Sequence, residues 1–90
     1  MKALCHILGV LRLLRFANLK NTNLSGFNLG WLRLQRIRLD GAQMIGTNLR
    51  GSNLAGAHLR GANLTDADLS GANLRGADLN GACLKNAYLQ

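Results

Sequence analysis

The chain has 90 residues and a formal net charge of +7, from 11 Lys and Arg against 4 Asp and Glu. Its 48% hydrophobic content is too high for charge-driven disorder, and the absence of Pro excludes collagen. Two Cys are too few for a disulfide-stapled secreted scaffold. A length of 90 residues favours a single domain.

The first segment, residues 1–16, has the sequence MKALCHILGVLRLLRF and predicts an amphipathic α-helix, because its apolar and charged residues fall on opposite sides of a helical wheel. The apolar run is too short to span a bilayer, and no small-x-small cleavage site follows it. We expect this helix to cap the domain that follows. The alternatives are a targeting segment, or a helix that binds a membrane or a partner through Lys2, Arg12 and Arg15.

From residue 17 onward the sequence repeats every five residues. Fifteen apolar residues stand at this spacing from Leu19 to Leu89, and all are Leu except Met44. A mostly small residue lies two positions before each centre, and nine of the fifteen positions directly before it are Asn or Asp. Two positions after the centre, twelve of fourteen residues are Gly, Asn or Asp.

A period of five excludes ordinary helices and flat strands, since neither would place all the Leu side chains on one face. A strand that turns a corner every five residues would place all the Leu side chains on the inner face. The small residue and Leu then point inward, and the residue between them points outward. Gly, Asn and Asp tolerate the positive φ of such corners. Corners of one hand close into coils that stack about 4.8 Å apart. The period therefore predicts a parallel β-solenoid, with three or four sides.

Stretches such as GANLTDADLSGANLRGADLNGACL (61–84) resemble the pentapeptide-repeat proteins, whose consensus is A-(D/N)-L-x-x. The resemblance covers 17–90 and implies four repeats per coil. We thus expect an all-β solenoid over 17–90, a right-handed quadrilateral parallel β-helix of nearly four coils, with a short N-terminal α-helical cap over 1–16. The coils would be 17–36, 37–56, 57–76 and the incomplete 77–90.

The segment 27–41, FNLGWLRLQRIRLDG, departs from the repeat rules. Larger residues replace Ala at its inward positions, and two corner positions lack Gly, Asn or Asp. Such departures are typical of functional or strained sites, although a close fit beneath the cap would also explain them. The candidate partner-binding residues are Trp31, Arg33, Arg36 and Arg38.

No catalytic, cofactor or metal signature stands out, so we expect no enzyme, no cofactor and no metal. His58 would lie in a column with an Arg and an Asp but with no second imidazole or nucleophile. Cys5 and Cys83 would lie about three coils apart, too far for a disulfide, and suit a reducing compartment such as the cytoplasm. Arg50, Arg60, Arg75 and Lys85 would lie on different sides, so nucleic acid is not the favoured partner.

These features favour a non-catalytic scaffold or adaptor that binds an acidic protein surface. The alternative is a peripheral accessory subunit of a membrane complex, photosynthetic for example, because the resemblance implies relatives abundant in cyanobacteria. The resemblance also includes gyrase-inhibiting DNA mimics, which the basic charge of this chain disfavours. The strand edge near Leu89 and Gln90 makes a homodimer through the C-terminal end a further hypothesis.

Overall fold

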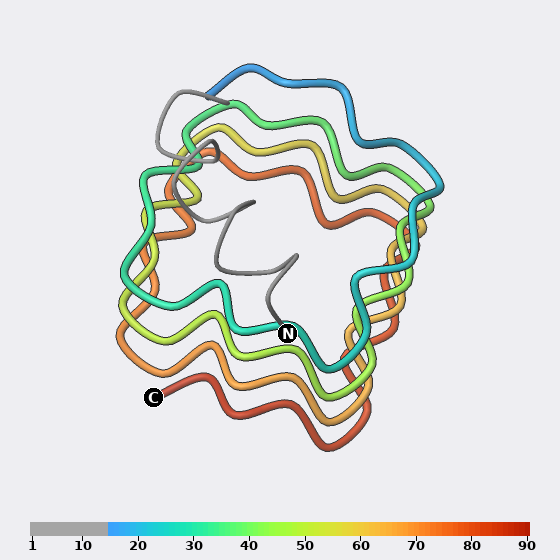
Figure 1. The fold of residues 1–90 in the computed structure, drawn as a ribbon, viewed down its shortest axis with the longest axis vertical. Helices are drawn as coiled ribbons and strands as arrows, with labels where there is room; N and C mark the ends of the chain where they lie inside the picture. Colours follow the sequence, from blue (N-terminus) through green and yellow to red (C-terminus); the bar gives the residue numbers. More distant parts are fainter. Residues whose placement is uncertain (1–14) are drawn as a thin grey trace.

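Each five-residue unit forms one side of a four-sided coil in the computed structural model, which describes residues 15–90. All the β-bridges are parallel and join residues 20 apart, from Asn18–Arg38 to Asp68–Tyr88. Each side carries a single bridged residue, so residues 15–90 contain isolated bridges and turns, without a helix or a longer strand. Figure 1 shows the coils stacked in register. The expected coil of 20 residues is confirmed.

The four sides are named here by their outward-facing residues. Side A carries residues 18, 38, 58 and 78; side B carries 23, 43, 63 and 83; side C carries 28, 48, 68 and 88; side D carries 33, 53 and 73. The two residues between successive sides form corners A–B, B–C, C–D and D–A. Coils 1 to 4 keep the bounds 17–36, 37–56, 57–76 and 77–90.

The second residue of every corner has a positive φ, between 58° and 75°. The amide three residues after each centre donates to that centre's carbonyl in most turns, as Ala42 does to Leu39 at 3.0 Å. Because only the second central residue has positive φ, these are type II turns, which favour Gly there. Nine of these corners hold Gly, as the sequence indicated, whereas Trp31 and Arg36 adopt the same strained conformation with full side chains.

Where the outward residue is Asn or Asp and coils lie on both sides, every backbone amide of the unit is satisfied, as the unit 62–66 illustrates. Its second, third and fifth amides donate to carbonyls of neighbouring coils at 2.8–2.9 Å, and its first donates to the preceding Leu at 3.1 Å. The remaining amide, of Thr65, donates to Oδ1 of Asn63 at 3.1 Å. Every outward Asn or Asp accepts such a bond from the amide two residues on. These side chains therefore complete the hydrogen bonding of the corner.

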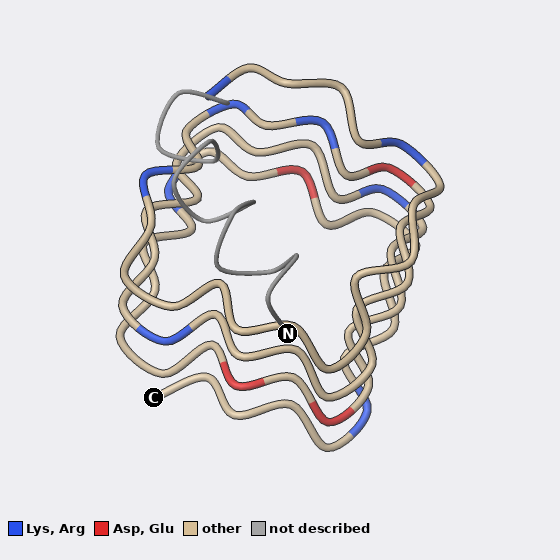
Figure 2. Cartoon of the chain, viewed as in Figure 1, with Lys and Arg blue, Asp and Glu red and all other residues tan. Residues whose placement is uncertain are grey.

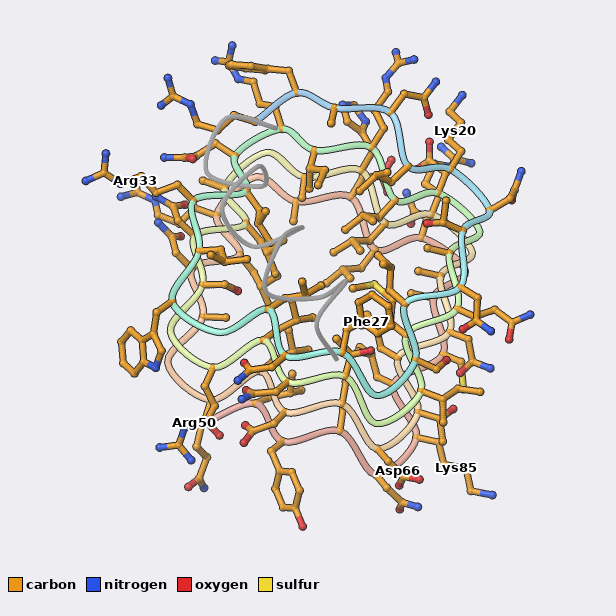
Figure 3. The ribbon with its side chains drawn as sticks, in the orientation of Figure 1. Lys20, Phe27, Arg33, Arg50, Asp66 and Lys85 are labelled. Carbon is orange, nitrogen blue, oxygen red and sulfur yellow. The ribbon has the colours of Figure 1, made fainter. Side chains whose placement is uncertain are left out.

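The column of centres forms the core. Its members from Leu29 to Leu69 are buried, including Met44. The small inward residues two positions before the centres, such as Ala57 and Ala62, pack between them. Three inward positions are polar, but the hydroxyls of Thr22, Thr47 and Ser52 donate to backbone carbonyls at 2.7, 2.7 and 2.8 Å. The larger inward residues of the first coils point into the interior, where Figure 3 labels Phe27.

The expected helix over 1–16 needs one correction. Arg15 and Phe16 lie in a turn, with Phe16 at φ 70° and its amide donating to the carbonyl of Gln35 at 3.2 Å. They occupy the D–A corner because the repeat register extends upstream of residue 17. The rest of that segment, with Lys2, Arg12 and Cys5, lies outside the described residues. Within 15–90 no helix is long and apolar enough to cross a bilayer.

Candidate functional site: an arginine-rich corner

The four candidate residues follow one another along the outer surface of coil 1 and the start of coil 2. Trp31 occupies the C–D corner, Arg33 the middle of side D, Arg36 the D–A corner and Arg38 the middle of side A. All four side chains are exposed. Figure 3 shows Arg33 projecting from the upper left of the coil. The three arginines surround one corner, whereas Trp31 lies on the corner before it.

Trp31 is 77% exposed, yet its ring is held in a defined position. Its six-membered ring lies directly against Gly51, the corner residue of the next coil, and a Cβ atom at that glycine would collide with the ring. Gly51 therefore serves two purposes, since it supplies positive φ and leaves room for the indole. A large aromatic surface held in one place is suited to contact a partner.

Arg36 is positioned in a similar way, by the coils on either side of it. Its Cγ would lie 3.1 Å from a Cβ built on Gly56, so its stem runs along the corner of the next coil. Its guanidinium carbon lies 5.8 Å from the ring centroid of Phe16, and that of Arg15 lies at the same distance. Phe16 thus contacts two guanidinium groups through cation–π interactions.

The arginines of the D–A corner extend further than the sequence analysis recognised. Arg15 and Arg75 occupy the first position of this corner, 60 residues and therefore three coils apart. With Arg36 at the corner and with Arg33 and Arg38 on the flanking sides, they form what we call the arginine corner: Arg15, Arg33, Arg36, Arg38 and Arg75. Figure 2 shows blue segments gathered at the upper left, and red segments mainly elsewhere. The signal that was missed is the spacing of 20 and its multiples, which places Phe16 above Arg36.

Other arginines are neutralised locally. Arg50 lies 3.7 Å from Asp68, and Arg60 lies 3.6 Å from Asp78, each pair joining one coil to the next. In the described part of the chain, no member of the arginine corner makes such a pair. As expected, Arg50, Arg60, Arg75 and Lys85 occupy four different corners. The arginine corner is therefore a local excess of positive charge.

Arg33 and Arg38 also lack the structural role that most other outward residues have. At most outward positions Asn or Asp accepts a bond from the amide two residues on, but Arg33 and Arg38 have no acceptor in their side chains. Where Gln43 and His58 replace Asn, Ser25 Oγ and Asp40 Oδ1 from the preceding coil accept that bond instead. Arg33 and Arg38 thus depart from a rule that stabilises the corners.

Two groups outside this corner have shifted pKa values. The pKa of Asp68 lies below the ordinary 3.8, first because the side chain of Ser70 and then its amide donate to the carboxylate, with Arg50 close by. The pKa of the exposed Cys83 thiol is lowered by its hydrogen bond with the side chain of Thr65 and by the amide of Lys85. Among residues 15–90 no cluster of His, Cys, Asp and Glu is arranged to hold a metal.

The expected column through His58 is confirmed, since bridges join residues 18, 38, 58 and 78 in turn. It brings the imidazole between Arg38 and Asp78. Within the described residues, this column adds no nucleophile beside the imidazole.

Comparison with known proteins agrees with this geometry. The family model of pentapeptide repeats matches residues 13–51 and 52–90, in 8 copies. A solved pentapeptide repeat protein, Rfr23 from the cyanobacterium Cyanothece 51142, is 37% identical with a TM-score of 0.70, over 81% of this chain and 56% of that one. Another, alr5209 from Nostoc Pcc 7120, is 35% identical with a TM-score of 0.76, over 91% of this chain and 73% of that one.

The chain thus spans little more than half the length of Rfr23. No curated protein matches the sequence. The relatives imply a right-handed, quadrilateral β-helix, which agrees with the four-sided coils described above.

Proposed function

Because this chain belongs to the pentapeptide-repeat family, we propose that it is a non-catalytic scaffold that binds an acidic surface of a partner protein through Trp31, Arg33, Arg36 and Arg38. Proteins of this family are generally non-catalytic and often interact with other proteins. The observation that carries the proposal is the departure of this one segment from the repeat rules, at exposed positions that form no ion pair with any residue of 15–90.

The residue types fit a protein interface. Trp and Arg are enriched among the residues that dominate binding energy, and a side chain fixed before binding loses less entropy on binding. Trp31 is held against Gly51, and Arg36 is held between Phe16 and Gly56. The net charge of +7 would also speed association with an acidic partner. The exposed free thiol of Cys83 agrees with a reducing compartment such as the cytoplasm.

The alternative of a membrane-complex subunit anchored through 1–16 receives less support. Arg15 belongs to a repeat corner rather than to that helix, and Lys2 and Arg12 lie outside the described residues. The basic corner also opposes mimicry of DNA, which requires negative charge on the surface.

The test is affinity capture with the whole chain and with the double variant Trp31→Ala/Arg33→Glu. We expect the wild-type chain to retain an acidic protein that the variant loses. Lys85→Glu is the matched control, because it makes the same charge change at the opposite B–C corner. Far-UV circular dichroism and thermal unfolding check that each variant is folded. Equal retention by wild type and double variant would remove these residues from the interface.

A further inference from the structure

We propose that the arginine corner binds an extended acidic segment that lies along the axis of the β-helix, with Arg15, Arg36 and Arg75 as successive contacts. This inference rests on the proposed function, and it adds the direction, length and chemistry of what is bound. It also extends the binding surface from one coil to four successive D–A corners, from the corner with Arg15 to the corner with Arg75.

The axial arrangement follows from the coil register. Arg15 and Arg75 occupy equivalent corner positions three coils apart, so about 14 Å separates their backbones at a coil spacing of about 4.8 Å. Arg36 lies one coil below Arg15. At the level between Arg36 and Arg75 the corner consists of Ala55 and Gly56, which are small, and the stem of Arg36 lies against Gly56.

The chemistry of the corner fits carboxylates. Guanidinium groups match carboxylates with paired donors and are always charged. Phe16 contacts Arg15 and Arg36 and so restricts both without neutralising them. Asp78 lies on side A two coils below Arg38 and pairs with Arg60, and Asp40 lies in the A–B corner, where its Oδ1 accepts from the amide of Arg60.

The spacing sets the size of the ligand. An extended chain rises about 3.3 Å per residue, so roughly four to five residues cover the distance from Arg15 to Arg75. Alternate side chains of such a segment point the same way and place three carboxylates towards the corner. An extended segment of consecutive acidic residues therefore fits better than a globular acidic patch that touches one coil.

The experiment measures binding of a fluorescein-labelled hexaglutamate peptide to the whole chain by fluorescence anisotropy at low ionic strength. Hexaglutamine is the control peptide. We expect the double variant Arg15→Gln/Arg75→Gln to bind about tenfold more weakly, since it loses two exposed charge contacts that each contribute about threefold in affinity. The double variant Arg60→Gln/Lys85→Gln loses the same charge at the A–B and B–C corners and should change affinity less than twofold.

A third variant separates position from net charge. Phe16→Leu leaves the charge unchanged but removes the ring that positions Arg15 and Arg36, so we expect about threefold weaker binding from the loss of the cation–π contacts. An unchanged affinity for Phe16→Leu would contradict the role of the ring.

The outcomes distinguish this inference from the proposed function. If Arg15→Gln/Arg75→Gln binds normally while Arg33→Gln/Arg38→Gln binds weakly, the axial arrangement is wrong and the one-coil interface remains. If both charge-matched double variants lose affinity equally, only long-range attraction is at work and the axial inference is overturned. Failure of the wild-type chain to bind hexaglutamate would overturn the axial inference, whereas the proposed function is tested by the affinity capture described above.

Discussion

The contact between Trp31 and Gly51 makes a sharp prediction about stability. We compare Gly51→Ala with Gly46→Ala, because both glycines are corner residues of coil 2, with φ of 62° and 68°. A Cβ at Gly46 would have no heavy atom within 4 Å, whereas one at Gly51 would collide with the indole of Trp31. The pair therefore isolates the effect of the tryptophan from the effect of the backbone.

The magnitude follows from two contributions. A non-glycine residue in the left-handed region costs about 1–2 kcal/mol, and the lower entropy of the unfolded chain returns about 0.4–1 kcal/mol. Gly46→Ala should therefore lose about 1 kcal/mol of unfolding free energy. Overpacking costs about 1–3 kcal/mol, and the exposed indole can swing outward, so Gly51→Ala should lose about 1 kcal/mol more. For a domain of this size, that difference lowers the melting temperature by roughly a further 4–8 °C.

The assay is urea and thermal unfolding followed by far-UV circular dichroism, together with fluorescence of the single Trp. We expect the emission of Gly51→Ala, but not of Gly46→Ala, to shift to the red as the indole leaves its position. In a Trp31→Ala background the two alanine variants should become equally stable. Equal losses in the wild-type background, or a difference that persists without Trp31, would refute the reasoning.

Three further predictions concern individual side chains. Asn73→Ala should lose about 1 kcal/mol of unfolding free energy because its side chain no longer accepts a bond from the amide of Arg75, while Asn73→Asp keeps the acceptor and should unfold near the wild-type urea midpoint. The folded pKa of Asp68 is lowered, so its stabilising effect is complete above pH 3.8 and is lost as pH falls through the folded value; Asp68→Asn should flatten the acid side of a stability–pH profile, and an unchanged profile would contradict this. The Cys83 thiol should react with a disulfide reagent at lower pH than an ordinary thiol, and Thr65→Val should move that pH dependence upward.

The local pattern predicts the interior and the corners of this fold, because each depends on residues only a few positions apart. The Leu centres point inward, and Gly, Asn or Asp occupies most corners at positive φ, as expected from strand alternation and turn chemistry. The number of sides depends on contacts between residues 20 apart, which a five-residue period does not determine. That number came from the resemblance to a family.

The same limit explains what was missed at the candidate site. Phe16 was assigned to a helix because residues 1–16 have helical periodicity, whereas the bond from its amide to Gln35 fixes it in the first corner. Once the coil has 20 residues, Phe16 lies above Arg36, and Arg15 lies in the same column as Arg75. The contribution of outward Asn and Asp to the corners was also missed, although side-chain bonds to the amide two residues on are common for these residue types.

Arg33 and Arg38 stand where most outward positions have Asn or Asp, and this leads to the last prediction. Replacing them should change stability and binding in opposite directions. Replacing each with Asn should supply the acceptor that nine other outward positions provide, and so raise the unfolding free energy by about 0.5–1 kcal/mol per site. The reciprocal control, Asn53→Arg, should lose a similar amount because Ala55 then has no such acceptor.

Hexaglutamate binding, measured on the same proteins, should weaken in Arg33→Asn/Arg38→Asn, since two charges leave the arginine corner. A chain that became more stable and bound less tightly would indicate that these arginines are retained for an interaction rather than for folding, as expected when stability exceeds what function requires. If the double variant instead unfolded more readily, the arginines would have a structural role, and the main argument for an interface at this segment would fail.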